Sequence, residues 1–262
     1  MDLLKRKKSK HRIITFTLHT ILLAYLILYC LCYRISLLKK VRIYFFGFVS
    51  LISLLKTYLS NPGFIIKNKE KKYDKSVLFL GTNTLINITS EYKMPFCREI
   101  VLDGFVFTEM FCIECNIFKN RSISHCNVCD RCVMERDHHC PWIDNCIGAA
   151  NFKYFIISIY TTTTCLYFTT ESTYRMIYSA FIPSFILPLI FIFTIIFSLA
   201  FIIFVALSFY YTMLIFCNTT AIQYIKNGFS YSKINPKEFL RFFCTFNTSY
   251  IESTPGTKTI PV

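Results

Sequence analysis

The stretch that decides the fold runs from Cys112 to Cys146 and reads CIECNIFKNRSISHCNVCDRCVMERDHHCPWIDNC. It holds seven of the 13 cysteines and three of the five histidines of the chain. Two thiolates separated by two residues can reach one metal ion from a single tight turn. Overlapping pairs of this kind therefore predict metal binding. They are Cys112/Cys115, Cys126/Cys129 and Cys129/Cys132.

The number of candidate ligands predicts two zinc ions and a remainder. A structural zinc ion takes four Cys or His ligands in a closed tetrahedral site. Two sites of three Cys and one His each leave one thiol and one imidazole over. A His beside a Cys lowers the pKa of the thiol and acts as its base, and the nearby Asp137 can hold that imidazole in one tautomer. Spacing alone does not say which Cys and His are left over.

The composition of the whole chain indicates an integral membrane protein. Of its 262 residues 54% are hydrophobic, the mean hydropathy is +0.45 and the formal charge is +14. A soluble domain of this composition could not cover its apolar residues with polar surface. The 28 Phe residues do not suit a nucleic-acid binder, so nucleic acid is not an expected partner. The charge fits basic segments outside the bilayer instead.

Four apolar stretches predict an all-α polytopic membrane protein, because a helix of roughly 20 residues crosses a bilayer. Basic residues concentrate at the amino terminus, in the long loop and in the tail, so the positive-inside rule places all three in the cytosol. Thiols stay reduced there, which favours metal binding over disulfides. The expected segments are 1–12 (basic amino terminus), 13–33 (first transmembrane helix), 43–60 (second), 61–108 (linker), 109–153 (cysteine-rich domain of short hairpins), 154–174 (third transmembrane helix), 187–217 (fourth) and 218–262 (cytosolic tail).

The cysteine-rich stretch closely resembles the DHHC domain of the protein S-acyltransferases, also called palmitoyltransferases. Residues 137–140 read DHHC, the signature of that family, and the cysteine spacing around them agrees with the family pattern without insertion. The resemblance is strong over residues 112–155. It extends more loosely to the arrangement of four spans around this domain.

The resemblance implies a catalytic cysteine: Cys140 would be the nucleophile, His138 its base and Asp137 the acid that orients His138. A long-chain acyl group would pass from palmitoyl-CoA, the co-substrate, to Cys140. It would then pass to cytosolic cysteines of proteins at the lipid bilayer. The resemblance also implies two structural Zn²⁺ ions. One would be held by Cys112, Cys115, His125 and Cys132, and the other by Cys126, Cys129, His139 and Cys146.

Outside this domain the chain departs from the family pattern. Residues 61–63 read Asn-Pro-Gly, where the family usually has Asp-Pro-Gly. Residues 219–222 read Thr-Thr-Ala-Ile, where it has Thr-Thr-x-Glu, and the missing acid predicts a different support of the site. Further on, Asn235 and Phe239 resemble the spacing of a tail motif that packs at the base of the site.

Three residues are candidates for binding acyl-CoA. Lys119 and Arg121 stand in a stretch that is basic in the family. They can contact the phosphates of CoA or simply be solvated. Trp142 follows Cys140 by two positions and is expected to pack at the mouth of the site, in a structural role as much as a catalytic one.

Other functions fit parts of the sequence. A RING-like ubiquitin-ligase module on a membrane anchor would need a different ligand order and would leave no Cys–His pair over. An inactive scaffold of the same family would fit the missing acid, and self-acylation separates it from an enzyme. A transporter usually has charged groups along its pathway, whereas residues 154–170 and 185–217 have none. The span lengths favour the thinner ER or Golgi membranes.

Overall fold

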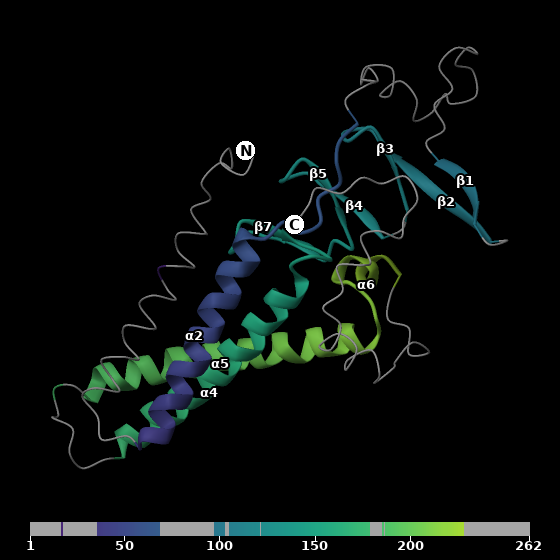
Figure 1. The fold of residues 1–262 in the computed structure, drawn as a ribbon. Helices are drawn as coiled ribbons and strands as arrows, with labels where there is room; N and C mark the ends of the chain where they lie inside the picture. The colour runs from purple at the N-terminus through teal and green to yellow at the C-terminus, as the bar shows by residue number, and fades with distance from the viewer. Residues whose placement is uncertain are drawn as a thin grey trace, which may run out of the picture.

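The computed structural model describes residues 17, 36–68, 97–102, 105–120, 122–178, 185 and 187–227. Almost all of the expected first span at 13–33 lies outside these residues, as do Arg121, Asn235 and Phe239. The described part is a bundle of long helices with a group of short β-hairpins at one end (Figure 1).

Three long helices form the bundle, and α4 packs against both α2 and α5 (Figure 1). The hydroxyls of Ser50 and Thr162 lie 2.5 Å apart between α2 and α4. The hydroxyls of Tyr160 and Thr212 lie 2.6 Å apart between α4 and α5. Such pairs satisfy polar groups that lie between the packed helices. The helices are α2 (Leu37–Leu59), α4 (Phe152–Ile177) and α5 (Leu187–Phe216), followed by the short α6 (Ala221–Asn227).

Helix α5 coincides with the expected fourth span at 187–217. Among the described residues it is the one helix that is long and apolar enough to cross a membrane by length and composition. Helices α2 and α4 occupy the ranges of the second and third spans. They are less apolar, because α2 includes four basic residues and α4 has consecutive threonines at 161–164 followed by Glu171. Membrane crossing by α2 and α4 therefore stays a prediction.

A series of antiparallel hairpins connects α2 to α4. One sheet has the order β1-β2-β3, and β4-β5 and β6-β7 form separate two-stranded sheets. Among the described residues the first strand, β1, starts at Cys97, inside the range predicted as a linker. The strands are β1 (Cys97–Leu102), β2 (Phe105–Cys112), β3 (Ile117–Lys119), β4 (Ile123–Cys126), β5 (Arg131–Met134), β6 (His138–Cys140) and β7 (Asn145–Ile147).

The hairpins β2–β3, β4–β5 and β6–β7 turn with the same backbone geometry. Asn116, Asp130 and Asp144 precede the second strand of each hairpin, fourteen residues apart, with φ of 55°, 50° and 57°. Asn and Asp enter this left-handed conformation more readily than other residues that have a side chain. The chain thus forms one type of hairpin three times in steps of fourteen residues.

Two buried asparagines fasten the hairpins to the end of α2. Asn145 Nδ2 donates to the carbonyl oxygens of Thr57, Tyr58 and Ser60 at 3.0, 3.3 and 3.0 Å. Asn151 Nδ2 donates to the Thr57 carbonyl at 3.2 Å. The last carbonyls of a helix have no partner inside the helix. The asparagine amides supply that partner and fix the position of β7 against α2.

The segment after α2 continues this attachment. Asn61 Oδ1 accepts hydrogen bonds from the N–H groups of Gly63 and Phe64 at 3.0 and 2.9 Å. A neutral amide oxygen therefore forms the turn at which the family usually has an Asp. Phe64 then pairs with Val133 in β5. Gly148 packs so closely here that a Cβ on it would lie 2.6 Å from Val133 Cγ1.

Replacement Asn145→Ala is expected to lower the free energy of unfolding by about 2 kcal/mol. The reason is that buried carbonyls of α2 lose their donor. Thermal unfolding of the purified protein in detergent measures the change. Asn127 in the β4–β5 turn is exposed, so Asn127→Ala should unfold at the wild-type temperature. Equal effects of the two replacements would contradict the attachment.

Candidate active site and metal centres

Cross-strand pairing brings the His and Cys ligands together. His125 lies opposite Cys132 in β4–β5, and His139 lies opposite Cys146 in β6–β7. Side chains of opposite residues lie on the same face of a strand pair. Each pair meets two thiols from the turn of the preceding hairpin. These turn thiols are Cys112 and Cys115 for the first pair, and Cys126 and Cys129 for the second.

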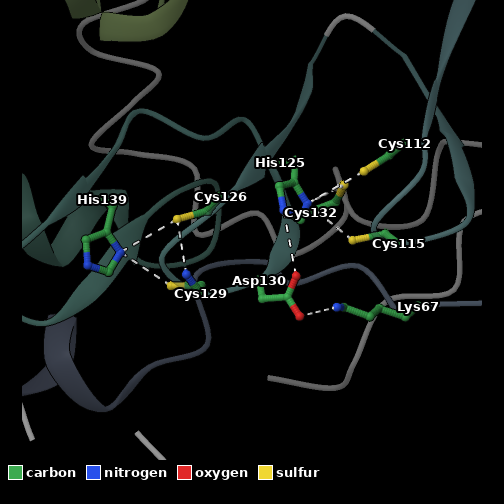
Figure 2. Close-up of polar contacts among 9 residues, drawn as sticks. All are labelled: Lys67, Cys112, Cys115, His125, Cys126, Cys129, Asp130, Cys132 and His139. Atoms are coloured by element: carbon green, nitrogen blue, oxygen red, sulfur yellow. Dashed lines mark hydrogen bonds and ion pairs between the residues drawn. The ribbon is translucent and has the colours of Figure 1, made fainter. Parts of the chain in front are cut away.

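Both clusters have the dimensions of tetrahedral zinc sites. Nδ1 of His125 lies 3.6, 3.4 and 3.9 Å from the sulfurs of its three cysteine partners (Figure 2). Nδ1 of His139 lies 3.8, 3.3 and 3.7 Å from its three. Zinc bonds of about 2.3 Å to sulfur and about 2.0 Å to nitrogen imply S···N separations of roughly 3.6 Å. The two Cys₃His clusters are therefore consistent with two zinc ions, and their members coincide with the two sets implied by the resemblance.

The thiols of one cluster affect one another's protonation strongly. Hydrogen bonds from Cys115 and Cys132 lower the pKa of Cys112 to about 2, whereas the hydrogen bond with Cys112 raises the pKa of Cys132. Three thiols at this distance cannot all ionise unless a cation compensates their charges. This donor set suits a divalent ion that takes thiolate ligands.

A carboxylate on the turn of the second hairpin faces the first cluster. Asp130 Oδ1 lies 3.9 Å from Nε2 of His125, the ring nitrogen that does not face the sulfurs. Asp130 Oδ2 lies 2.6 Å from Nζ of Lys67 (Figure 2). A carboxylate behind a metal-ligating histidine orients its ring. Asp130 directly follows Cys129, a member of the second cluster. Its contact with His125 therefore connects the turn that holds the second cluster to the first cluster.

Strand β6 places the neighbouring histidines His138 and His139 on opposite faces. Successive side chains of a strand point to opposite faces, so His139 faces the second cluster while His138 and Cys140 share the other face. The Cys140 side chain lies near enough to the imidazole of His138 to raise its pKa. Cys140 is only 7% exposed. This Cys and this His are the ones that the clusters leave over within residues 112–146 as described.

Asp137 contacts the imidazole of His138 through the ring nitrogen Nδ1. Its carboxylate is fully buried, and Oδ2 lies 2.8 Å from Nδ1 of His138. Burial lowers the pKa of His138, but the hydrogen bonds to Asp137 and Cys140 raise it more, to about 9. With Nδ1 donating to the carboxylate, Nε2 is the nitrogen that can accept a proton from a thiol. The imidazole is therefore oriented and strengthened as a base.

Two further donors reach the Asp137 carboxylate from the end of the helix bundle. The N–H of Ala221 donates to Oδ1 at 2.5 Å, and the hydroxyl of Tyr211 in α5 donates to Oδ2 at 3.0 Å. Sequence reasoning missed Tyr211, because a tyrosine near the end of an apolar span is common whatever its contacts. Only the fold shows that its hydroxyl meets a carboxylate 74 residues away in the chain.

Gln223 stands one position after the place of the missing acid and hydrogen-bonds to Thr220. Gln223 Oε1 accepts from the N–H of Thr220 at 3.2 Å, and the N–H of Gln223 donates to Thr220 Oγ1 at 3.3 Å. This reciprocal pairing is a capping box, which begins a helix. It starts α6 at Ala221 and so places the N–H that binds Asp137. The support of the site thus differs from the family pattern in its side chain, while the segment still contacts the site.

Trp142 and Lys119, two of the three residues expected to bind acyl-CoA, stand on different hairpins. Trp142 is 55% exposed and stands in the turn between β6 and β7, next to Cys140. Lys119 is half-buried at the end of β3. Their contact with acyl-CoA, like that of Arg121, stays a prediction.

Comparison with known proteins agrees with this geometry. The family described as DHHC palmitoyltransferase matches residues 106–228. That range contains both clusters, Cys140, His138 and every contact of Asp137 given above. The chain belongs to the DHHC palmitoyltransferase family. Both Cys₃His clusters and the Cys140–His138 pair lie inside its DHHC domain.

Two relatives with known names are similar to part of this chain. "Probable protein S-acyltransferase 7" of Arabidopsis thaliana is 32% identical over 123 residues, which are 47% of this chain and 28% of that protein. "Palmitoyltransferase ZDHHC18" of Homo sapiens is 30% identical over 192 residues, which are 68% of this chain and 46% of that protein. The DHHC chain therefore spans less than half the length of these relatives.

Purified protein is expected to contain about two zinc ions per chain. Cys112→Ser should reduce this to about one or fewer, because the first cluster loses a thiolate. Cys165→Ser removes a buried thiol in α4 outside both clusters and should keep two. Elemental analysis after gel filtration measures the metal. Full zinc content in Cys112→Ser would break the ligand assignment.

Proposed function

We propose that the protein is an S-acyltransferase that moves a long-chain acyl group, typically palmitoyl, from acyl-CoA to cysteine thiols of proteins at the membrane. The observation that supports this most is the buried Asp137–His138–Cys140 arrangement. The two Cys₃His clusters each have four ligands without these three residues, so the three side chains remain free for chemistry. Membership of the DHHC palmitoyltransferase family gives the substrate class.

In this proposal two zinc ions are structural. One is held by the cluster of His125 and the other by the cluster of His139, and each has four protein ligands. A closed tetrahedral site offers no open position to a substrate. The ions therefore tie the hairpins together, and the chemistry falls to the side chains of Asp137, His138 and Cys140.

The first step forms an acyl-enzyme. His138 Nε2 takes the proton of the Cys140 thiol, and the thiolate attacks the carbonyl carbon of the acyl-CoA thioester. The carbon–sulfur bond to CoA breaks, and the CoA sulfur leaves with the proton that His138 returns. Asp137 keeps the imidazole in one tautomer and stabilises it while it is protonated.

The second step transfers the acyl group. A thiol of the protein substrate gives its proton to His138 and attacks the Cys140 thioester. The bond between the acyl carbon and the Cys140 sulfur breaks, and Cys140 recovers a proton from the imidazolium. The product is an S-acylated protein, and the enzyme returns to its starting state.

The surroundings of Cys140 suit a substrate with an apolar tail. Cys140 packs in one apolar cluster with Leu54 of α2, Ile159 of α4 and Leu214 of α5. An acyl chain gains about 0.8 kcal/mol for each CH₂ that leaves water. The nucleophile at the end of the helix bundle can thus meet an acyl chain that stays among the helices or in lipid. CoA phosphates would stay outside, near Lys119 and Arg121, with Trp142 at the mouth of the site.

The proposal includes the membrane arrangement predicted from the sequence. Four transmembrane helices would place the termini and the DHHC domain in the cytosol, where the protein substrates present their cysteines. Helix α5 supports one of these spans. An ER or Golgi location rests on span length alone.

Incubation of the purified protein with radiolabelled palmitoyl-CoA is expected to give a hydroxylamine-sensitive label on Cys140. The replacement Cys140→Ala should abolish that label, because the thioester forms on this sulfur. Cys165→Ser should label like the wild type. A hydroxylamine-sensitive label on Cys140→Ala would refute the assigned nucleophile.

Adjacent histidines provide a matched test. His138→Gln is expected to slow self-acylation roughly 100-fold or more while both zinc ions remain, because a general base is lost. His139→Gln should lose zinc, because a ligand is lost. Labelling rate and zinc content are measured on the same samples. Loss of zinc in His138→Gln, or its retention in His139→Gln, would reverse the two assignments.

A further inference from the structure

The Asp137 carboxylate has an unusual set of partners for a group so deeply buried. It is 0% exposed, and its charge must be balanced by protein donors, because a buried polar group without a partner is costly. Oδ1 accepts from the backbone N–H of Ala221. A substitution of the Ala221 side chain would leave this N–H in place. Oδ2 accepts from His138 and from the hydroxyl of Tyr211. Tyr211 therefore acts on the oxygen that orients His138.

The ring of Tyr211 is buried and packs against other aromatic rings. It is 4% exposed, and its ring packs edge-on against Phe155 with centroids 5.3 Å apart. Phe155 in turn packs edge-on against the His138 imidazole at 5.4 Å. Edge-to-face packing of this kind favours defined ring orientations. The Tyr211 hydroxyl is therefore aimed at the carboxylate by rigid surroundings and is 3.5 Å from His138 Nδ1.

We propose that Tyr211 is a positioning residue of the acyl-transfer reaction, acting on His138 through the Asp137 carboxylate. The inference rests on the proposed function and adds to it a residue of α5. The Tyr211 hydroxyl and the Nδ1–H of His138 both donate to Oδ2 of Asp137. Together they keep the carboxylate from rotating away from the imidazole. Nδ1 then retains its proton, and Nε2 stays available to the Cys140 thiol.

Through Tyr211, strand β6 with His138 and Cys140 is connected to α5, the described helix that is long and apolar enough to cross a membrane. Tyr211 lies in the last two turns of α5, and α5 packs against α4. A displacement of α5 along α4 would therefore draw the hydroxyl away from Asp137. The orientation of His138 depends in this way on the packing of the bundle as well as on β6.

The test compares two replacements that each remove one tyrosine hydroxyl and keep the ring. Tyr211→Phe deletes the donor to Asp137. Tyr160→Phe deletes the hydroxyl that binds Thr212 between α4 and α5, so it weakens the same helix interface without touching Asp137. Self-acylation rate is measured against palmitoyl-CoA concentration, together with zinc content and thermal unfolding.

Tyr211→Phe is expected to lower the maximal labelling rate about tenfold, the size expected for one hydrogen bond to a charged group. The palmitoyl-CoA concentration at half-maximal rate and the zinc content should stay unchanged. Tyr160→Phe should keep the wild-type rate. In an Asp137→Asn background the carboxylate is gone, so adding Tyr211→Phe should slow labelling less than about twofold.

Four outcomes overturn the inference. A wild-type rate in Tyr211→Phe shows that the hydroxyl does not position the site. Equal slowing by Tyr160→Phe, or full slowing by Tyr211→Phe in the Asp137→Asn background, assigns the effect to helix packing. If the wild-type protein acquires no label at all, the proposed function fails, and the inference fails with it.

Discussion

Metal–thiolate bonding is the constraint on which the arrangement of the hairpins depends. The strands of β4–β5 and β6–β7 are three or four residues long, and segments this short cannot fold on buried apolar area alone. The β4–β5 hairpin gives its strand residues His125 and Cys132 to the first cluster and its turn thiols to the second. Each zinc ion would therefore join two successive hairpins. The position of Cys140 on the third follows from both junctions.

Directional hydrogen bonds join this region to the helices. The amides of Asn145 and Asn151 bind carbonyls at the end of α2, and Asp137 binds donors from α5 and from the start of α6. Apolar contacts alone allow sliding, whereas each of these buried bonds loses its partner if a strand moves by one residue. The hairpins therefore sit on the bundle in one register. The Cys140 thiol is consequently held at a fixed depth against the apolar cluster.

The sequence predicted the two Cys₃His clusters better than the contacts that support the site. Cys and His positions are informative because metal geometry restricts their spacing, so the two clusters could be expected from residues 112–146 with the help of the resemblance. Contacts of Asn145 with α2 and of Tyr211 with Asp137 depend on how distant elements pack, which no local pattern encodes. The absence of an acid at residue 222 did not indicate how this segment meets the site, since only the fold shows that the N–H of Ala221 contacts Asp137.

The fourteen-residue step between the hairpins places the Cys140 thiol at the same turn position as two thiols of the clusters. Cys112 and Cys126 begin the turns of the first two hairpins and belong to the two Cys₃His clusters, and Cys140 occupies the same position in the third. Four positions onward, Asp144 repeats the left-handed turn of Asn116 and Asp130. The second thiol of the turn, however, is replaced by Ile143. Cys140 thus has the turn position of a metal-binding cysteine without its companion ligand. Under the proposed function, the turn geometry that elsewhere presents sulfur to a cation would here present it to a carbonyl carbon.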